Sequence, residues 1–126
     1  MKTEQQKVGR KGEDIACRYL EEHGHVVIAR NYRKSYAEID IITLDSEGIH
    51  FVEVKTRVAP AVADPEDNVD YQKRRHLVSA AQDYIHSDEC PRGDYEFFFD
   101  VIAIWLLPDG EADIQYYPKA FVPMYT

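Results

Sequence analysis

Four charged residues within two apolar segments have the types and spacing to do chemistry: Glu38, Asp40, Glu53 and Lys55. Because side chains alternate along a strand, the first two share one face of their strand and the last two share one face of the next. If residues 45–48 form the turn of a hairpin, Asp40 lies across from Glu53. The same register places Glu38 across from Lys55. Opposed Cβ atoms are about 4.5–5.5 Å apart, so the four side chains are predicted to converge.

Two carboxylates that face each other in a largely apolar pair of strands repel unless a cation lies between them. A site made of oxygen ligands selects Mg²⁺ or Mn²⁺ over zinc. Lys55, next to such an ion, would orient or deprotonate a water, or stabilise negative charge on a phosphate. The set would therefore support metal-dependent hydrolysis. For a generic protein, a cross-strand set of ion pairs at a solvated end of the hairpin is the more common explanation.

The segments that must position these residues alternate between helical and strand periodicity. Apolar spacing predicts a helix over residues 3–22 and a second helix over 71–86, capped by Asp70. The predicted strands cover residues 26–28, 39–44, 49–54, 95–107 and 114–117. Residues 31–35 are expected to be a polar connection and residues 59–68 a loop. The order α-β-β-β-α-β-β predicts an α/β fold with a mixed sheet and a helix on each face or at each end.

Both faces of the predicted hairpin are largely apolar. The face opposite the charged residues is expected to hold Ile39, Ile41, Val52 and Val54. The face of the charged residues continues as Ile42, Leu44, Ile49 and Phe51. Both faces are therefore predicted to be mostly buried.

Composition and charge limit the classes of protein. A chain of 126 residues, 44% of them hydrophobic, fits one domain over residues 1–126 with a buried core. The formal net charge of -8 argues against a surface that attracts nucleic acid all over. Residues 1–36 nevertheless carry eight Lys and Arg against five Asp and Glu. Two basic clusters could line a binding face or be solvated charge runs: Arg10, Lys11, Arg30, Arg33 and Lys34, and then Lys73, Arg74 and Arg75.

Targeting and redox signals are sparse. No apolar run is long enough to span a bilayer and no secretory signal follows Met1, so we expect a cytoplasmic protein with no membrane partner. Cys17 and Cys90 stand in no Cys-x-x-Cys spacing and are expected to be reduced. His23 and His25 lack further ligands at a suitable spacing and are interpreted as a surface turn rather than a metal site.

An aspartate followed on the next strand by Glu-x-Lys, and preceded by a helix bearing Glu13, resembles the restriction-endonuclease-like PD-(D/E)xK superfamily. Over most of its length the sequence resembles the bacterial YraN family of predicted endonucleases, which is similar in turn to archaeal Holliday-junction resolvases. The residues that carry this resemblance are 9–13, Ala16, Leu20, 31–33, 38–40, 51–57, Lys73 and 99–102. Two departures are Ala37, where that family usually has glycine, and an acidic segment over 59–70 in place of a glycine-rich one.

The resemblance implies a restriction-endonuclease-like three-layer core, in which a mixed β-sheet is flanked by helices, and a Mg²⁺ or Mn²⁺ cofactor. Carried over residue by residue, it makes Asp40 and Glu53 the metal ligands and Lys55 the catalytic lysine. Glu13 becomes a helix-borne catalytic acid that joins the metal or its water shell, and Glu38 a supporting member. The implied substrate is DNA with branched, flapped or single-stranded regions, and a homodimer is left open.

Phosphate contacts are expected from six basic residues: Arg10, Lys11, Arg33, Arg57, Lys73 and Arg74. The predicted function is therefore a metal-dependent nuclease acting on DNA. The acidic balance leaves another class open, a non-catalytic nucleic-acid-binding or partner-binding module that keeps the nuclease fold.

Overall fold

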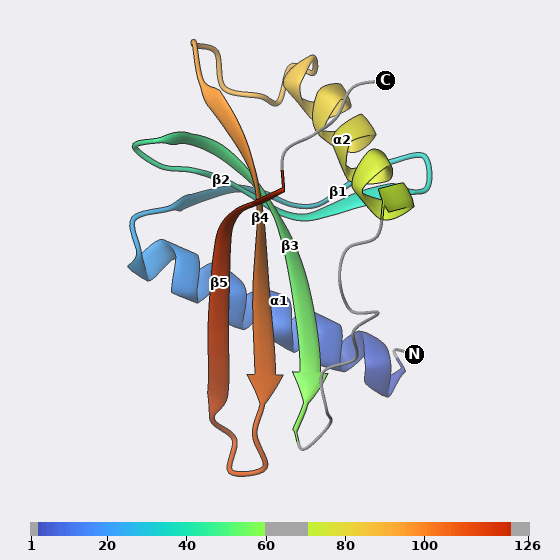
Figure 1. Cartoon of the computed structure of the whole chain (residues 1–126), viewed down its shortest axis with the longest axis vertical. Helices are drawn as coiled ribbons and strands as arrows, with labels where there is room; N and C mark the ends of the chain where they lie inside the picture. Colours follow the sequence, from blue (N-terminus) through green and yellow to red (C-terminus); the bar gives the residue numbers. More distant parts are fainter. Residues whose placement is uncertain (1–2, 60–70, 122–126) are drawn as a thin grey trace.

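The computed structural model describes residues 3–59 and 71–121 of the chain. Within these residues, two helices and five strands follow one another in the predicted order (Figure 1). Their bounds are Glu4–Glu22 for α1, Val26–Lys34 for β1, Ala37–Leu44 for β2, Gly48–Val58 for β3, Tyr71–Ile85 for α2, Glu96–Leu106 for β4 and Ala112–Phe121 for β5.

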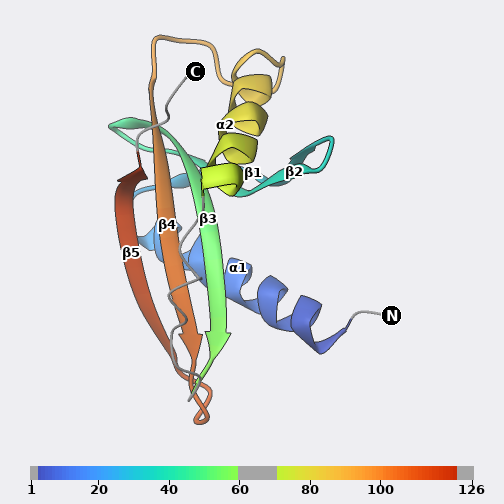
Figure 2. The ribbon, with the colours of Figure 1, turned by 45° about the vertical axis from the view of Figure 1, so that its right-hand side comes forward.

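The five strands form a single sheet in the order β1-β2-β3-β4-β5. Neighbouring strands are antiparallel, except that β3 and β4 are parallel. A parallel pair needs a crossover connection, and α2 lies within this one. The helices pack on opposite faces of the sheet, which gives three layers (Figures 1 and 2). The predicted α/β fold with a mixed sheet flanked by helices is confirmed, and it is consistent with a restriction-endonuclease-like core.

Helix α1 begins at a capping box. Thr3 Oγ1 accepts a hydrogen bond from the backbone N–H of Gln6, and the Gln6 side chain accepts one from the backbone N–H of Thr3. The helix buries Ala16, Cys17 and Leu20 against the sheet. Their partners are Ile41, Val52, Ile102 and Ile104, from β2, β3 and β4. This packing fixes α1 across the strands that carry the charged residues.

Helix α2 covers the other face of the sheet. Its buried residues are Leu77, Ala80, Ala81 and Tyr84. They pack on Ile39, Ile42, Ile49, Phe51 and Phe99. The first turn of α2, which carries Lys73, is thereby held near β3. No helix in residues 3–59 or 71–121 is long and apolar enough to span a membrane.

Four strands, β1, β2, β3 and β5, are longer than the sequence predicted, and the difference is largest for β1 and β5. β1 continues through residues 32–34, which were predicted to be a polar connection and which pair with residues 37–39 of β2. β5 likewise extends beyond residues 114–117 on both sides. Both are edge strands, where one side of the backbone is open to water and polar side chains are tolerated. The predicted Asp70 cap and, apart from Ala59, the predicted loop over 59–68 lie outside the described residues.

The predicted register of the hairpin is confirmed next to its turn. Leu44 pairs with Ile49, and the regular pairing continues as far as Ile41 and Val52. The four-residue turn over 45–48 therefore sets the alignment of β2 with β3, as the sequence indicated.

The predicted faces of the hairpin are wrong for Ile39. It packs with Ile42 beneath α2, whereas Ile41 packs beneath α1. The alternation of β2 is therefore broken at Asp40. On β1, the residue between the partners of Ile39 and Ile41 is Asn31, whose φ of 53° is left-handed. Asparagine tolerates this conformation better than most residues, and it lies beside the position where the alternation of β2 is broken.

Candidate active site

The regular backbone pairing of β2 with β3 runs from Leu44 to Ile41 and ends before Asp40. At Asp40 the side chain, and not the backbone, bonds to β3. Its Oδ2 accepts a hydrogen bond of 2.8 Å from the backbone N–H of Val54 in β3. The carboxylate therefore occupies the position in which a strand carbonyl would otherwise satisfy this donor. This contact holds Asp40 between the two strands.

Asp40 and Glu53 interact strongly through their charges. Burial raises the pKa of Asp40, and the negative charge of Glu53 raises it further, to about 8. Glu53 is only 7% exposed. Lys73 Nζ, from α2, lies 2.6 Å from Glu53 Oε1. The two carboxylates converge, although through the irregular position of Asp40 rather than the regular cross-strand pair that the sequence predicted.

Glu13 reaches the same region from α1. Burial raises the pKa of its carboxyl, and contacts with Asn31 and Arg30 partly offset that effect. With its amide nitrogen turned toward the carboxylates, Asn31 donates to Glu13 Oε1 at 3.2 Å and to Glu38 Oε1 at 2.9 Å. The left-handed Asn31 thus joins α1 to β2, a contact that the sequence did not predict. Residue 31 was assigned to a polar connection, and the only signal for its conformation was that asparagine tolerates positive φ.

The predicted cross-strand pair of Glu38 with Lys55 does not belong to the regular pairing. Glu38 pairs instead with Arg33 of β1, and Arg33 Nη2 donates to Glu38 Oε2 at 2.7 Å. Lys55 pairs with Ala103 of β4 and is half-buried. The regular register of β2 and β3 ends before it reaches these positions. Lys55 still shares a face of β3 with Glu53, because the two residues are two positions apart.

A groove of about 750 Å³ opens beside Glu13 and Glu38. Its lining combines three arginines with the two carboxylates and their asparagine: Gln6, Gly9, Arg10, Glu13, Arg30, Asn31, Arg33 and Glu38. Arg30 lies 2.8 Å from Asp14 and 3.6 Å from Glu13, so it is held in place by α1. The groove therefore presents positive charge next to the acidic residues, an arrangement suited to a phosphate group near a bound cation.

The six basic residues predicted to contact phosphate do not all lie in this groove. Arg10 and Arg33 line it, and Lys73 contacts Glu53. The guanidinium of Arg74 stacks 5.2 Å from the ring centre of Phe121, and Arg57 Nη1 donates to the carbonyl of Thr56. The lining includes neither of these two residues, nor Lys11. Arg30 is the groove residue missing from the predicted set, although the sequence placed it in the basic N-terminal cluster.

The carboxylates of Glu13, Asp40 and Glu53 would suit a hard divalent cation. Their oxygen donors are those that Mg²⁺ and Mn²⁺ prefer. Burial and the charge of Glu53 raise the pKa of Asp40 to about 8, and a bound dication would stabilise its ionised form. Among the described residues, the metal-ligating side chains that gather most closely form a different group: His25, Asp45 and His50, whose ligand atoms all lie within 4.8 Å of one another.

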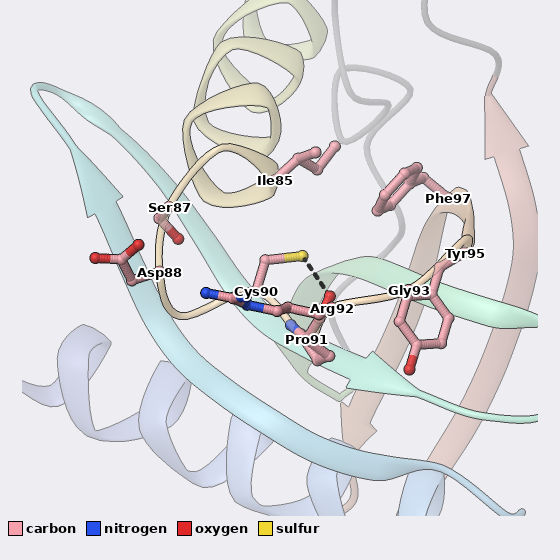
Figure 3. Close-up of a pocket in the computed structure, with 9 residues that line it drawn as sticks. All are labelled: Ile85, Ser87, Asp88, Cys90, Pro91, Arg92, Gly93, Tyr95 and Phe97. Carbon is pink, nitrogen blue, oxygen red and sulfur yellow. Dashed lines mark hydrogen bonds between the residues drawn. The ribbon is translucent and has the colours of Figure 1, made fainter.

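A second cavity, of about 320 Å³, lies between the end of α2 and the start of β4 (Figure 3). Its lining contains one thiol, Cys90, which donates to the carbonyl of Pro91 at 3.6 Å. Burial raises the pKa of Cys90, which disfavours the reactive thiolate. The nearby Asp88 carboxylate points away from the cavity (Figure 3). Cys17 and Cys90 are both free, in agreement with their predicted reduced state.

Comparison with known sequences gives a consistent family relationship. The pattern of the uncharacterised protein family UPF0102 matches residues 12–104. A UPF0102 protein of Alkaliphilus oremlandii is 37% identical over 91% of this chain and 97% of its own length. One of Bacteroides thetaiotaomicron is 36% identical over 96% of this chain and 97% of its own length. One of Chloroherpeton thalassium is 41% identical over 78% of this chain and 74% of its own length. The YraN resemblance seen in the sequence fits these matches, whose names state a family and no activity.

Proposed function

This chain belongs to the uncharacterised protein family UPF0102, and we propose that it is a Mg²⁺- or Mn²⁺-dependent nuclease that hydrolyses phosphodiester bonds in DNA, with branched or flapped DNA as the favoured substrate. The observation that carries the proposal is the buried Asp40 carboxyl, held by the N–H of Val54 beside Glu53, with its pKa raised to about 8. Ionising a buried carboxyl beside a second carboxylate costs several kcal/mol, and a bound dication would offset that cost.

In this mechanism Asp40 and Glu53 would hold the ion, with Glu13 joining from α1. A bound ion would supply Lewis acidity toward the phosphate and would lower the pKa of a water. Lys73, 2.6 Å from Glu53, holds that carboxylate in place and partly neutralises it in the metal-free protein. Asn31 fixes the orientation of Glu13. Lys55, on the same face of β3 as Glu53, orients the water or stabilises the negative charge that develops on the phosphate.

The arginines of the groove give the substrate its position. Arg10, Arg30 and Arg33 line one continuous surface next to Glu13. Guanidinium groups bind phosphate oxygens in a fixed fork geometry, so three of them would align a DNA backbone beside the acidic residues. This local positive charge would allow the groove to bind DNA although the whole protein has a net charge of -8.

The test is cleavage of labelled single-stranded, duplex, flapped and four-way-junction DNA, with Mg²⁺, with Mn²⁺ and with a chelator. We expect the wild type to cut at least one substrate only when a metal is present, and Glu53→Gln to reduce cutting to background. Glu47→Gln is the matched control, because Glu47 is exposed in the hairpin turn and pairs with Lys119. Folded wild-type protein that cuts no substrate with either metal would contradict the proposal.

DNA binding should depend on Arg33 through its charge. In the inactive Glu53→Gln background, Arg33→Gln is expected to weaken binding to all sequences alike. It should also reduce the slope of log K against log salt concentration by about 1, because one phosphate contact is lost. Fluorescence anisotropy of labelled DNA at several salt concentrations measures both quantities. Arg92→Gln, at an exposed position beside the second cavity, should leave the slope unchanged; equal slopes for all three proteins would remove Arg33 from the interface.

A second candidate function is a non-catalytic module that binds nucleic acid. The net charge of -8 motivates it, because this charge limits extended contact with a phosphate backbone and fits local binding at a branch. This candidate predicts that the wild type binds branched DNA in the anisotropy experiment but does not cut it with either metal. The cleavage assay therefore separates the two functions.

A further inference from the structure

A second buried polar cluster lies at the turn end of the β2–β3 hairpin, away from the carboxylates of the candidate active site. It consists of His25, which precedes β1, Asp45 in the turn and His50 in β3. The two imidazole rings are 4.7 Å apart and meet edge to face. The side chains of His25, Asp45 and His50 are only 5%, 14% and 2% exposed. The interpretation of His25 as part of a surface turn was therefore wrong.

The Nε2 atoms of both histidines face the Asp45 carboxylate. His50 Nε2 lies 2.8 Å from Asp45 Oδ1, and His25 Nε2 lies 3.5 Å from Asp45 Oδ2. Each ring is oriented by a contact to its other nitrogen. His50 Nδ1 lies 2.6 Å from Asp100 Oδ2, and His25 Nδ1 lies 2.7 Å from Thr43 Oγ1.

Asp100 anchors this arrangement. It is completely buried, and its carboxylate also accepts hydrogen bonds from the hydroxyl of Tyr116 and from the backbone N–H of Lys119. A carboxylate can only accept hydrogen bonds, so His50 Nδ1 carries a proton and donates a hydrogen bond to Asp100. In proteins this carboxylate–histidine contact is typical of a histidine whose Nε2 binds a metal, because it fixes the tautomer and the direction of the ring.

The metal-free cluster holds two carboxylates, Asp45 and Asp100, in a largely buried region. A dication bound between Asp45 and the two imidazoles would neutralise both negative charges.

We propose that His25, Asp45 and His50 form a zinc site, in which Zn²⁺ binds to Nε2 of each histidine and to the Asp45 carboxylate. Two imidazoles and one carboxylate are a ligand set that suits zinc and is poorly suited to Mg²⁺. The site differs in ligands and position from the Asp40–Glu53 site and does not depend on the proposed nuclease activity. Bound zinc would join the start of β1 to the β2–β3 turn. Through His50 and Asp100 it would also connect this turn with β4.

The test is zinc binding by the full chain after dialysis against a chelator. Isothermal titration in competition with a chelator of known affinity should give one Zn²⁺ per chain with a Kd below about 1 μM, and zinc should raise the Tm by about 5 °C. Mg²⁺ should do neither through this site. Nitrogen NMR of the wild-type imidazoles should show zinc-induced shifts at Nε2 of two histidines, with both Nδ1 atoms unaffected by coordination.

Variants identify the ligands. His25→Gln and His50→Gln should each weaken zinc binding by about 100-fold or more, and the milder Thr43→Val, which removes only the contact to His25, by about tenfold. His86→Gln, at an exposed histidine of the chain, and Glu53→Gln should bind zinc like the wild type. If His50→Gln fails to fold, the NMR result and Thr43→Val still decide the question. A folded wild type that does not bind zinc, or zinc binding unchanged in His25→Gln and Thr43→Val, would overturn the proposal.

Discussion

Replacing Asp40 by asparagine should stabilise the metal-free protein at pH 8.5 and, in the same variant, remove DNA cleavage. The pKa of Asp40 is raised from 3.8 to about 8, first by burial and then by the charge of Glu53. Asparagine cannot ionise, yet its side-chain oxygen can still accept the hydrogen bond from Val54. The variant therefore escapes the cost of the buried charge and loses a ligand of the proposed metal.

The stabilisation should depend on pH in a defined direction. In the unfolded chain Asp40 loses its proton near pH 4, whereas in the folded protein it keeps the proton up to about pH 8. The folded state therefore binds more protons across this window, and the contribution of Asp40 to stability is lost as the pH rises. The Tm advantage of Asp40→Asn should be small near pH 4, grow between pH 4 and 8 and then level off.

The size of the effect follows from the same shift. Each pKa unit corresponds to about 1.4 kcal/mol, so the wild type bears a penalty of several kcal/mol above pH 8. Because 1 kcal/mol moves the Tm of a domain of this size by about 3–5 °C, a rise of at least about 5 °C is expected at pH 8.5. Calorimetry in the presence of a chelator measures it, with Asp94→Asn, at an exposed carboxylate, as the control. A lower Tm for Asp40→Asn at pH 8.5 would show that Asp40 has a structural role.

Gly12→Ala should destabilise the protein, although alanine is the better helix former. A Cβ atom at position 12 would lie 1.8 Å from Thr56 Oγ1, and 2.7 and 2.8 Å from Thr56 Cγ2 and Cβ. α1 would have to move away from β3, at a cost of about 1–3 kcal/mol beyond the gain in helix propensity. Glu13, the next residue, would move with it, so DNA cleavage should fall as well.

Gly9 offers a matched control within the same helix. A Cβ atom there meets nothing within 4 Å, so Gly9→Ala should stabilise the protein by about 0.5–1 kcal/mol. Adding Thr56→Ala to Gly12→Ala removes the two closest contacts and should restore part of the lost stability and cleavage. Denaturant unfolding curves for the four proteins give the comparison. If Gly12→Ala proves as stable as Gly9→Ala, the close packing of α1 on β3 is not what holds Glu13 in place.

Much of the fold could be predicted because it depends on local patterns. The apolar spacing of the two helices and the turn at residues 45–48 determined the element order and the register from Leu44 to Ile41. The extent of β1 could not be predicted, because residues 32–34 are polar and become a strand only through pairing with β2 at the sheet edge. Ile39 was assigned to the wrong face because regular alternation cannot predict the break at Asp40.

The candidate active site, too, could be predicted from the sequence only in part. That Asp40 and Glu53 lie close together followed from counting along a hairpin. The contacts of Glu53 with Lys73 and of Glu13 with Asn31 join residues from different elements, and only the packing of both helices on the sheet brings them together. The His25 cluster was missed for the same reason, because its Asp100 and Tyr116 partners come from β4 and β5.

The single parallel pair, β3 with β4, also has a consequence for the order of folding. It divides the sheet into two antiparallel units, β1–β2–β3 and β4–β5, in which consecutive strands are joined by short connections. Contacts within each unit are local and are expected to form early, because the parallel pair joins residues far apart in the chain and carries a larger loop-closure entropy. Glu13, Asp40 and Glu53 all precede or belong to β3. The acidic residues of the candidate active site can therefore meet in the first half of the chain, before the second half docks and completes the core.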